Sequence, residues 1–125
     1  MGHRPAWRAI VMPLAAVFSL LGCSRQVSFE GDVRPILDNR CVKCHKPGGE
    51  GYLKSGLDLE NYKGLMKGTK FGPVVVPGSS INSTLVNLIE HKASSAINMP
   101  HNEAPLPEEQ VELIKRWVDQ GAKNN

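Results

Sequence analysis

The first regular feature of the chain is a helical spacing of apolar side chains between residues 29 and 41. These side chains recur at positions i, i+4, i+7, i+8 and i+12, which places them on one helix face; they are Phe29, Val33, Ile36, Leu37 and Cys41. Asp32 is a suitable N-cap, and it would place Pro35 in the first turn, where its missing N–H is not needed. The pattern therefore predicts a helix over about residues 33–43 that carries two cysteines near its end.

A second apolar stripe predicts a helix near the C-terminus, formed by Val111, Ile114, Trp117 and Val118. Pro107 stands near the start of this segment, and Glu108 and Glu109 in its first turn complement the helix dipole. Gly121 is a suitable stop signal just beyond the last apolar position. This is the clearest element that the sequence predicts.

The segments between these two helices have weaker patterns and many Gly and Pro residues. We expect one or two helical turns over residues 60–66 and a helix over residues 84–91, capped by Ser80 or Ser83. Loops are predicted around residues 47–51, 68–78 and 94–107, and the short apolar run at 74–76 is too short to found a sheet. The fold class is therefore all-α, with loops long enough to wrap around a bound group.

Composition fits one soluble globular domain. The chain has 125 residues, of which 41% are hydrophobic and 22% are charged, and these values exclude intrinsic disorder of the whole chain. The formal net charge is +3, and it falls to +1 when Arg4 and Arg8, in the leader described next, are left out. Bulk charge therefore excludes a nucleic-acid-binding protein.

Residues 1–22 are predicted to be a signal peptide. His3, Arg4 and Arg8 form a basic start, and the uncharged run from Ala9 to Leu21 is too short to span a bilayer. The sequence Leu20-Leu21-Gly22-Cys23 resembles the lipobox of bacterial lipoproteins, in which the cysteine is acylated and becomes the new N-terminus. We therefore expect an exported chain with Cys23 as its lipidation site, followed by a short linker to residue 28. The alternative is an ordinary signal peptide that leaves Cys23 as a free thiol.

The motif with the most specific chemistry is Cys41-Val42-Lys43-Cys44-His45. A C-x-x-C-H run places two thiols about one helical turn apart, which suits two thioether bonds to the vinyl groups of one haem. The imidazole of His45 would then be the proximal iron ligand. We therefore expect one covalently attached haem c per chain.

Three other interpretations of this motif are less compatible with the sequence. A thioredoxin-like redox pair needs a βαβ pattern, which is lacking. A zinc site needs a fourth ligand, and His91 and His101 are spaced too widely for a zinc finger. A disulfide between Cys41 and Cys44 would close too small a loop to add much stability.

The sixth iron ligand is predicted to be Met99. It lies far enough beyond His45 for the chain to pass around the haem edge, and the following Pro100 biases it to extended geometry. Its neighbours are polar, so an apolar residue has no obvious core role there. His101 is the main competitor. Met66 is a weaker candidate because core packing accounts for it, and His91 is weaker because it lies near a predicted helix end, where it would interact with the helix dipole.

Taken together, these motifs resemble class I c-type cytochromes and, more closely, the small planctomycete-type cytochrome c domains. The resemblance covers residues 29–122 and rests on the haem motif and on Asp32-Val33-Arg34-Pro35-Ile36-Leu37, Gly56-Leu57-Asp58-Leu59, Val75-Val76-Pro77-Gly78, Met99-Pro100 and Trp117-Val118-Asp119-Gln120-Gly121-Ala122. It implies a cytochrome c domain over residues 29–122, with a tail at 123–125. It also implies that the first and last helices cross and pack, with Val33 and Leu37 against Ile114 and Trp117.

The function expected from these features is single-electron transfer by a lipid-anchored cytochrome in the cell envelope, its haem domain facing the periplasm or the cell exterior. An iron with two protein ligands leaves no position for a substrate, so we expect an electron carrier and no catalytic residues. Two alternatives stay open: a haem enzyme or ligand-binding haem protein, and a haem subunit of a larger oxidoreductase complex. The expected partners are an unidentified redox protein and, through the lipid, a membrane.

Overall fold

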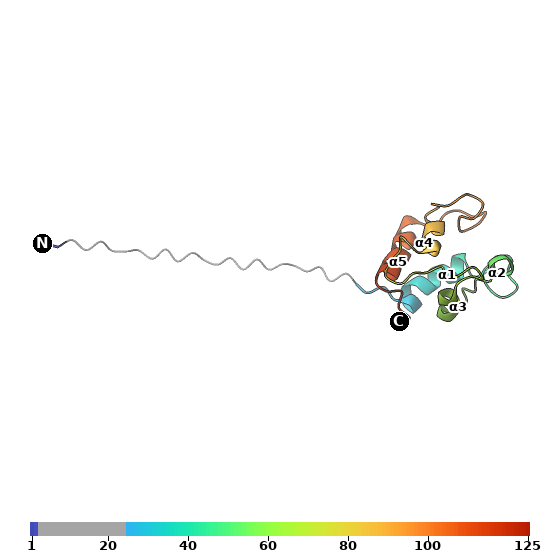
Figure 1. Cartoon of the computed structure of the whole chain (residues 1–125), viewed down its shortest axis with the longest axis horizontal. Helices are drawn as coiled ribbons and strands as arrows, with labels where there is room; N and C mark the ends of the chain where they lie inside the picture. Colours follow the sequence, from blue (N-terminus) through green and yellow to red (C-terminus); the bar gives the residue numbers. More distant parts are fainter. Residues whose placement is uncertain (3–24) are drawn as a thin grey trace.

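The computed structural model describes residues 1–2 and 25–125, so Cys23 and the predicted lipobox lie outside the described residues. The elements are a π-helical turn (Phe29–Val33) and five helices, α1 (Arg34–Arg40), α2 (Glu50–Ser55), α3 (Tyr62–Lys67), α4 (Thr84–Ile89) and α5 (Glu108–Asp119) (Figure 1). No strand occurs within the described ranges, only an isolated bridge between Thr69 and Gly72. The predicted all-α class is confirmed. None of the helices in the described part of the chain is long and apolar enough to cross a membrane.

The first helix begins earlier and ends earlier than the sequence predicts. Its N-cap is Ser28, whose hydroxyl accepts a hydrogen bond from the Gly31 N–H at 3.1 Å. Asp32, the expected cap, instead accepts a bond from the Ser28 N–H at 2.8 Å. The helical turn therefore starts at residue 29. The two helical segments together end at Arg40, and both cysteines lie in the turn that follows.

The other bounds agree in part with the predictions. Helix α3 and helix α5 occur where they were expected. Helix α4 ends two residues before the predicted end because its chain turns into a left-handed conformation at His91. Helix α2 was not predicted, since the glycine-rich stretch at 47–51 indicated only a loop, yet the helix begins at Glu50 and includes Gly51.

The core joins the first and last helical segments of the domain. Trp117 of α5 lies 5.5 Å from Phe29 between ring centroids, and Tyr62 of α3 packs edge-on against Phe29 at 5.2 Å. Val33 and Leu37 are buried in the same apolar cluster as Trp117 and Ile114. The π-helical turn packs against α5, as does α4, so the predicted packing between the first and last helical segments is present.

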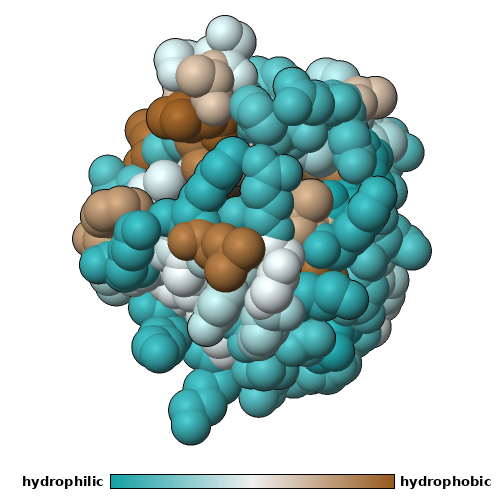
Figure 2. Space-filling view, turned by 90° about the vertical axis from the view of Figure 1, so that its right-hand side faces the viewer, coloured by the Kyte–Doolittle hydropathy of each residue, from teal (hydrophilic) through white to brown (hydrophobic). Residues whose placement is uncertain are grey.

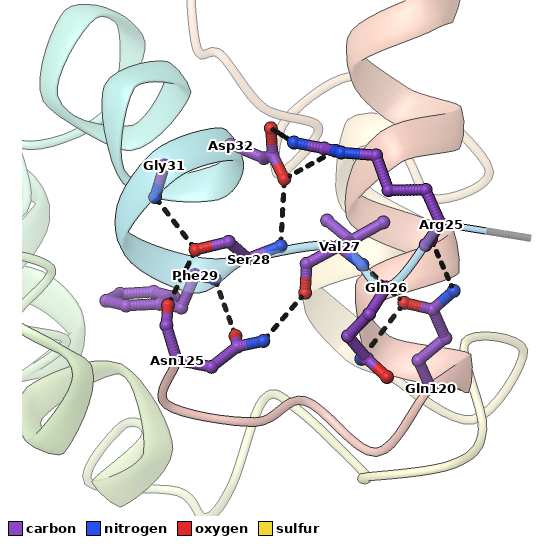
Figure 3. A network of polar contacts seen from close by, with 9 residues as sticks. All are labelled: Arg25, Gln26, Val27, Ser28, Phe29, Gly31, Asp32, Gln120 and Asn125. Atoms are coloured by element: carbon purple, nitrogen blue, oxygen red, sulfur yellow. Dashed lines mark hydrogen bonds and ion pairs between the residues drawn. The ribbon is translucent and has the colours of Figure 1, made fainter.

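The chain just before the first helix is fixed to the chain just after the last one (Figure 3). Val27 is only 2% exposed, and its N–H donates to the Gln120 side-chain oxygen at 2.7 Å. The Asn125 side-chain oxygen accepts a bond from the Phe29 N–H at 2.9 Å, and the Asn125 carbonyl accepts one from the Ser28 hydroxyl at 2.7 Å. The polypeptide is therefore held against the domain from about residue 26 onward.

Candidate functional site

The two cysteines lie in a tight turn at the end of α1. Cys41 is the C-cap of α1, and its carbonyl accepts bonds from the N–H groups of Cys44 (3.1 Å) and His45 (3.0 Å). Cys41 is partly exposed and Cys44 is exposed, and neither is in a disulfide. The turn brings two free thiols and one imidazole onto one short stretch of chain.

His45 is the buried member of this motif. The residue is 9% exposed, and its Nδ1 atom is buried without a hydrogen-bond partner among the described residues. Burial lowers the pKa of His45, and the neighbouring Leu57 main chain opposes this shift in part. The lowered pKa favours the neutral imidazole, which is the form that binds a metal.

Helix α2 covers the His45 ring with a glycine. A Cβ atom built on Gly51 would lie 2.7 Å from the ring Cε1 and 2.9 Å from Nε2. Contacts that short do not occur between real side chains, so only a residue without Cβ fits here. Sequence analysis missed this role, because Gly51 looked like one of several loop glycines.

A cavity of about 590 Å³ adjoins these residues. Its volume is in the range of sites for cofactors and drug-sized ligands. Much of the wall is apolar and comes from distant parts of the chain, including Leu57, Leu59, Val74, Leu85, Leu88 and Ile89. On the face shown in Figure 2, exposed apolar side chains interrupt the polar surface, and exposed Phe71 and Ile97 line the cavity.

The structure brings all four predicted haem-binding residues to this cavity: Cys41, Cys44, His45 and Met99. His101, the main competitor of Met99, lines the same cavity. Met66, by contrast, is partly buried against the apolar core, as expected for a packing residue. His91 is exposed and does not line this cavity.

The residues at the cavity fit a covalently bound haem. The thiols of the C-x-x-C-H run, a buried and neutral imidazole, and an apolar wall are the donor set and the surroundings that such a group requires. Gly51 leaves room beside the imidazole for nothing larger than its own hydrogen atoms, so the ring is held in a defined place. Within the described ranges, no three His, Cys, Asp or Glu side chains group as ligands for a metal ion.

The comparisons with known proteins agree with this site. A family model described as "Planctomycete cytochrome C" matches residues 41–103, which is half of the chain. The hydrazine synthase subunit alpha of Kuenenia stuttgartiensis is 27% identical over 127 residues, which cover 79% of this chain and 16% of that protein. No solved structure is significantly similar to the chain. The family match begins at the first haem-motif cysteine and extends past Met99, and the chain therefore belongs to the planctomycete cytochrome c family.

Proposed function

We propose that this protein is a monohaem cytochrome c that carries single electrons outside the cytoplasm while attached to a membrane by lipid on Cys23. Cys41 and Cys44 would hold the haem through thioether bonds, and His45 and Met99 would be its axial ligands. The observation that carries this proposal is the meeting of these four residues, from two distant segments, at one apolar cavity.

The surroundings of the Cys41 thiol suit an uncharged sulfur. Burial raises the pKa of the Cys41 thiol to about 11, so the sulfur at this wall is uncharged at neutral pH. Addition of the S–H group across a haem vinyl group would form a C–S bond and move the hydrogen to the other vinyl carbon, so no charge would arise in the apolar wall. Cys44 lies at the exposed edge of the same turn.

The axial residues favour electron transfer over catalysis. Haem supplies reversible one-electron chemistry, and the protein sets its potential through axial ligands, burial and hydrogen bonds. If the His45 imidazole and the Met99 sulfur both bind the iron, no iron position would be left for a substrate. The apolar wall would limit the access of water to the haem.

Export and lipid anchoring rest on the sequence. The lipobox-like residues 20–23 support acylation of Cys23, and two acyl chains or more give stable anchoring where one does not. The start of the folded domain within a few residues of Cys23 fits a protein held close to its anchor.

A second candidate function is that of a haem subunit in a larger complex. It is favoured by the similarity to the hydrazine synthase subunit alpha, which is by its name part of an enzyme. This chain spans only 16% of the length of that subunit. Copurification of the native protein with a partner chain through gel filtration would support this second function.

The test of the proposal is spectroscopic. On a denaturing gel the protein should keep its haem stain, and acid–acetone should not extract the colour, because the bonds to Cys41 and Cys44 are covalent. The ferric protein should show the weak red charge-transfer band of sulfur ligation. Met99→Ala should abolish that band and lower the reduction potential, since methionine ligation raises it.

Two results would contradict the proposal, each in a different part. Complete extraction of the colour by acid–acetone would exclude covalent haem. A charge-transfer band that survives in Met99→Ala but disappears in Met66→Ala would show that the wrong methionine has been assigned. Met66→Ala is thus the matched control, because Met66 packs against the core.

A further inference from the structure

His91 occupies a backbone position that glycine usually fills. It follows the end of α4 with φ of +57°, in the left-handed region. Its N–H donates to the Leu88 carbonyl at 3.2 Å, and the Lys92 N–H donates to the Asn87 carbonyl at 3.0 Å. This pair of bonds is the Schellman arrangement, in which the left-handed residue is most often glycine. A Cβ atom is disfavoured at this position relative to glycine, although histidine is found in the left-handed region more often than most residues.

The imidazole of His91 contacts the main chain of Met99. Its Nε2 atom lies 3.1 Å from the Met99 carbonyl oxygen. A carbonyl oxygen can only accept, so Nε2 carries the proton and donates it. The left-handed turn is what brings a side chain from the end of α4 back to this loop.

The same helix end also holds the other side of Met99. The Met99 N–H donates to the Leu88 carbonyl at 3.1 Å. At the base of the loop, the Asn98 side chain bonds both the N–H and the carbonyl of Ala93, at 3.1 and 3.0 Å. Met99 is therefore bound through its N–H and through its carbonyl to two residues of one turn.

We propose that His91 is a positioning residue for Met99: its Nε2–H fixes the Met99 carbonyl and so holds the Met99 thioether at the haem cavity. This inference rests on the proposed iron ligation by Met99. His91 itself does not touch the iron in this assignment. Loss of the His91 side chain would leave Met99 in place but less firmly positioned, so that an added ligand could displace Met99 from the iron more easily.

The test uses the haem-loaded protein and imidazole as the added ligand. His91→Gly removes the donor but leaves the residue that is most favourable at a left-handed position. His91→Gln keeps an N–H donor the same number of bonds from Cα. Lys92→Ala is the matched control, because the Lys92 side chain pairs with Glu90. The dissociation constant of imidazole from the ferric protein is measured for each variant, together with the charge-transfer band and urea unfolding.

In His91→Gly we expect imidazole to bind about three- to tenfold more tightly, which is the effect of losing one hydrogen bond of ordinary strength. The charge-transfer band should weaken, while the urea midpoint should not fall, because glycine relieves the backbone. His91→Gln should restore most of the wild-type affinity, and Lys92→Ala should match the wild type.

The outcomes separate this inference from the function on which it rests. If Met99→Ala removes the charge-transfer band but His91→Gly binds imidazole as the wild type does, the positioning role is overturned and the ligation stands. If Met99→Ala leaves the band unchanged, Met99 is not the ligand, and the positioning role is overturned with it. The positioning role would also be overturned if His91→Gly lowered the free energy of unfolding by as much as it changed the free energy of imidazole binding. A general destabilisation of the domain would then explain both effects.

Discussion

Gly51 shows how one missing side chain shapes the site. The imidazole of His45 lies so close to α2 that a Cβ atom at position 51 would come within 2.7 Å of the ring. Because protein interiors are close-packed and yield little, the ring or the helix would have to move. The glycine is therefore part of the binding site, although it offers no functional group.

We expect Gly51→Ala to destabilise the haem-loaded protein by about 1–3 kcal/mol, the usual cost of overpacking a buried site. Displacement of the ring should also shift the absorption bands that report axial ligation. Urea unfolding and the absorption spectrum measure the two effects. Gly31→Ala is the matched control: it too is a helical glycine, but its Cβ would lie 3.4 Å from the nearest atom, in ordinary contact. Equal stability of the two variants would refute the role of Gly51.

At the scale of the element, the start of the first helix depends on one carboxylate. Asp32 accepts bonds from the Arg25 guanidinium at 2.9 and 3.0 Å and from the Ser28 N–H at 2.8 Å. The Arg25 bond, followed by the Ser28 bond, lowers the pKa of Asp32 below its ordinary value of 3.8. A carboxyl with a lower pKa in the folded state stabilises the fold above its unfolded pKa and loses this effect as pH falls.

Asp32→Asn should therefore lower the free energy of unfolding at pH 7 by about 1 kcal/mol, the usual net contribution of one intramolecular hydrogen bond. The difference in stability from the wild type should shrink as the pH falls below about 4. The wild-type Asp32 carboxyl then becomes protonated and neutral, like the asparagine amide. This difference is measured by urea unfolding of both proteins at a series of pH values. Asp38→Asn breaks only an exposed pair with Arg34 and should cost less than about 0.5 kcal/mol. A difference for Asp32→Asn that is constant from pH 7 to pH 2 would contradict this explanation.

The first and last helices show what sequence patterns could and could not predict. Helix α5 was predictable because its start and stop signals, Pro107 and Gly121, are local. The start of the first helix was not, because Ser28 lies in what looked like a linker and is held by Asn125 from the other end of the chain. The position of Cys41, Cys44 and His45 in one short turn could be predicted from their spacing alone. The meeting of α2 with the His45 ring depends on tertiary contacts that no local pattern contains.

At the scale of the whole molecule, the segment just before the first helix lies beside the C-terminus, away from α2. The segment from residue 26 to residue 28 is bound to Gln120 and Asn125, while α2, which lines the cavity, lies at the opposite end of the domain (Figure 1). If Cys23 carries lipid, only Ser24 separates the anchor from Arg25, whose carbonyl accepts a bond from the Gln120 side chain at 3.2 Å. Fully extended, two residues reach roughly 7 Å. Helix α2, and the part of the cavity wall that it forms, would then lie on the side of the domain away from the membrane.

This arrangement leads to a prediction about Cys23, which lies outside the described residues. In the full-length gene, Cys23→Ser should block lipidation, so that the protein is either left with its leader and runs larger or is cut elsewhere and becomes soluble. Haem attachment should be unchanged, because Cys41 and Cys44 lie in a separate turn. Membrane fractionation, mass spectrometry of the N-terminus and haem staining measure these effects, and Ser24→Ala is the control that keeps the thiol. If the wild-type protein is soluble with an unacylated N-terminus, the anchor and the orientation that follows from it are wrong, and the cytochrome assignment is unaffected.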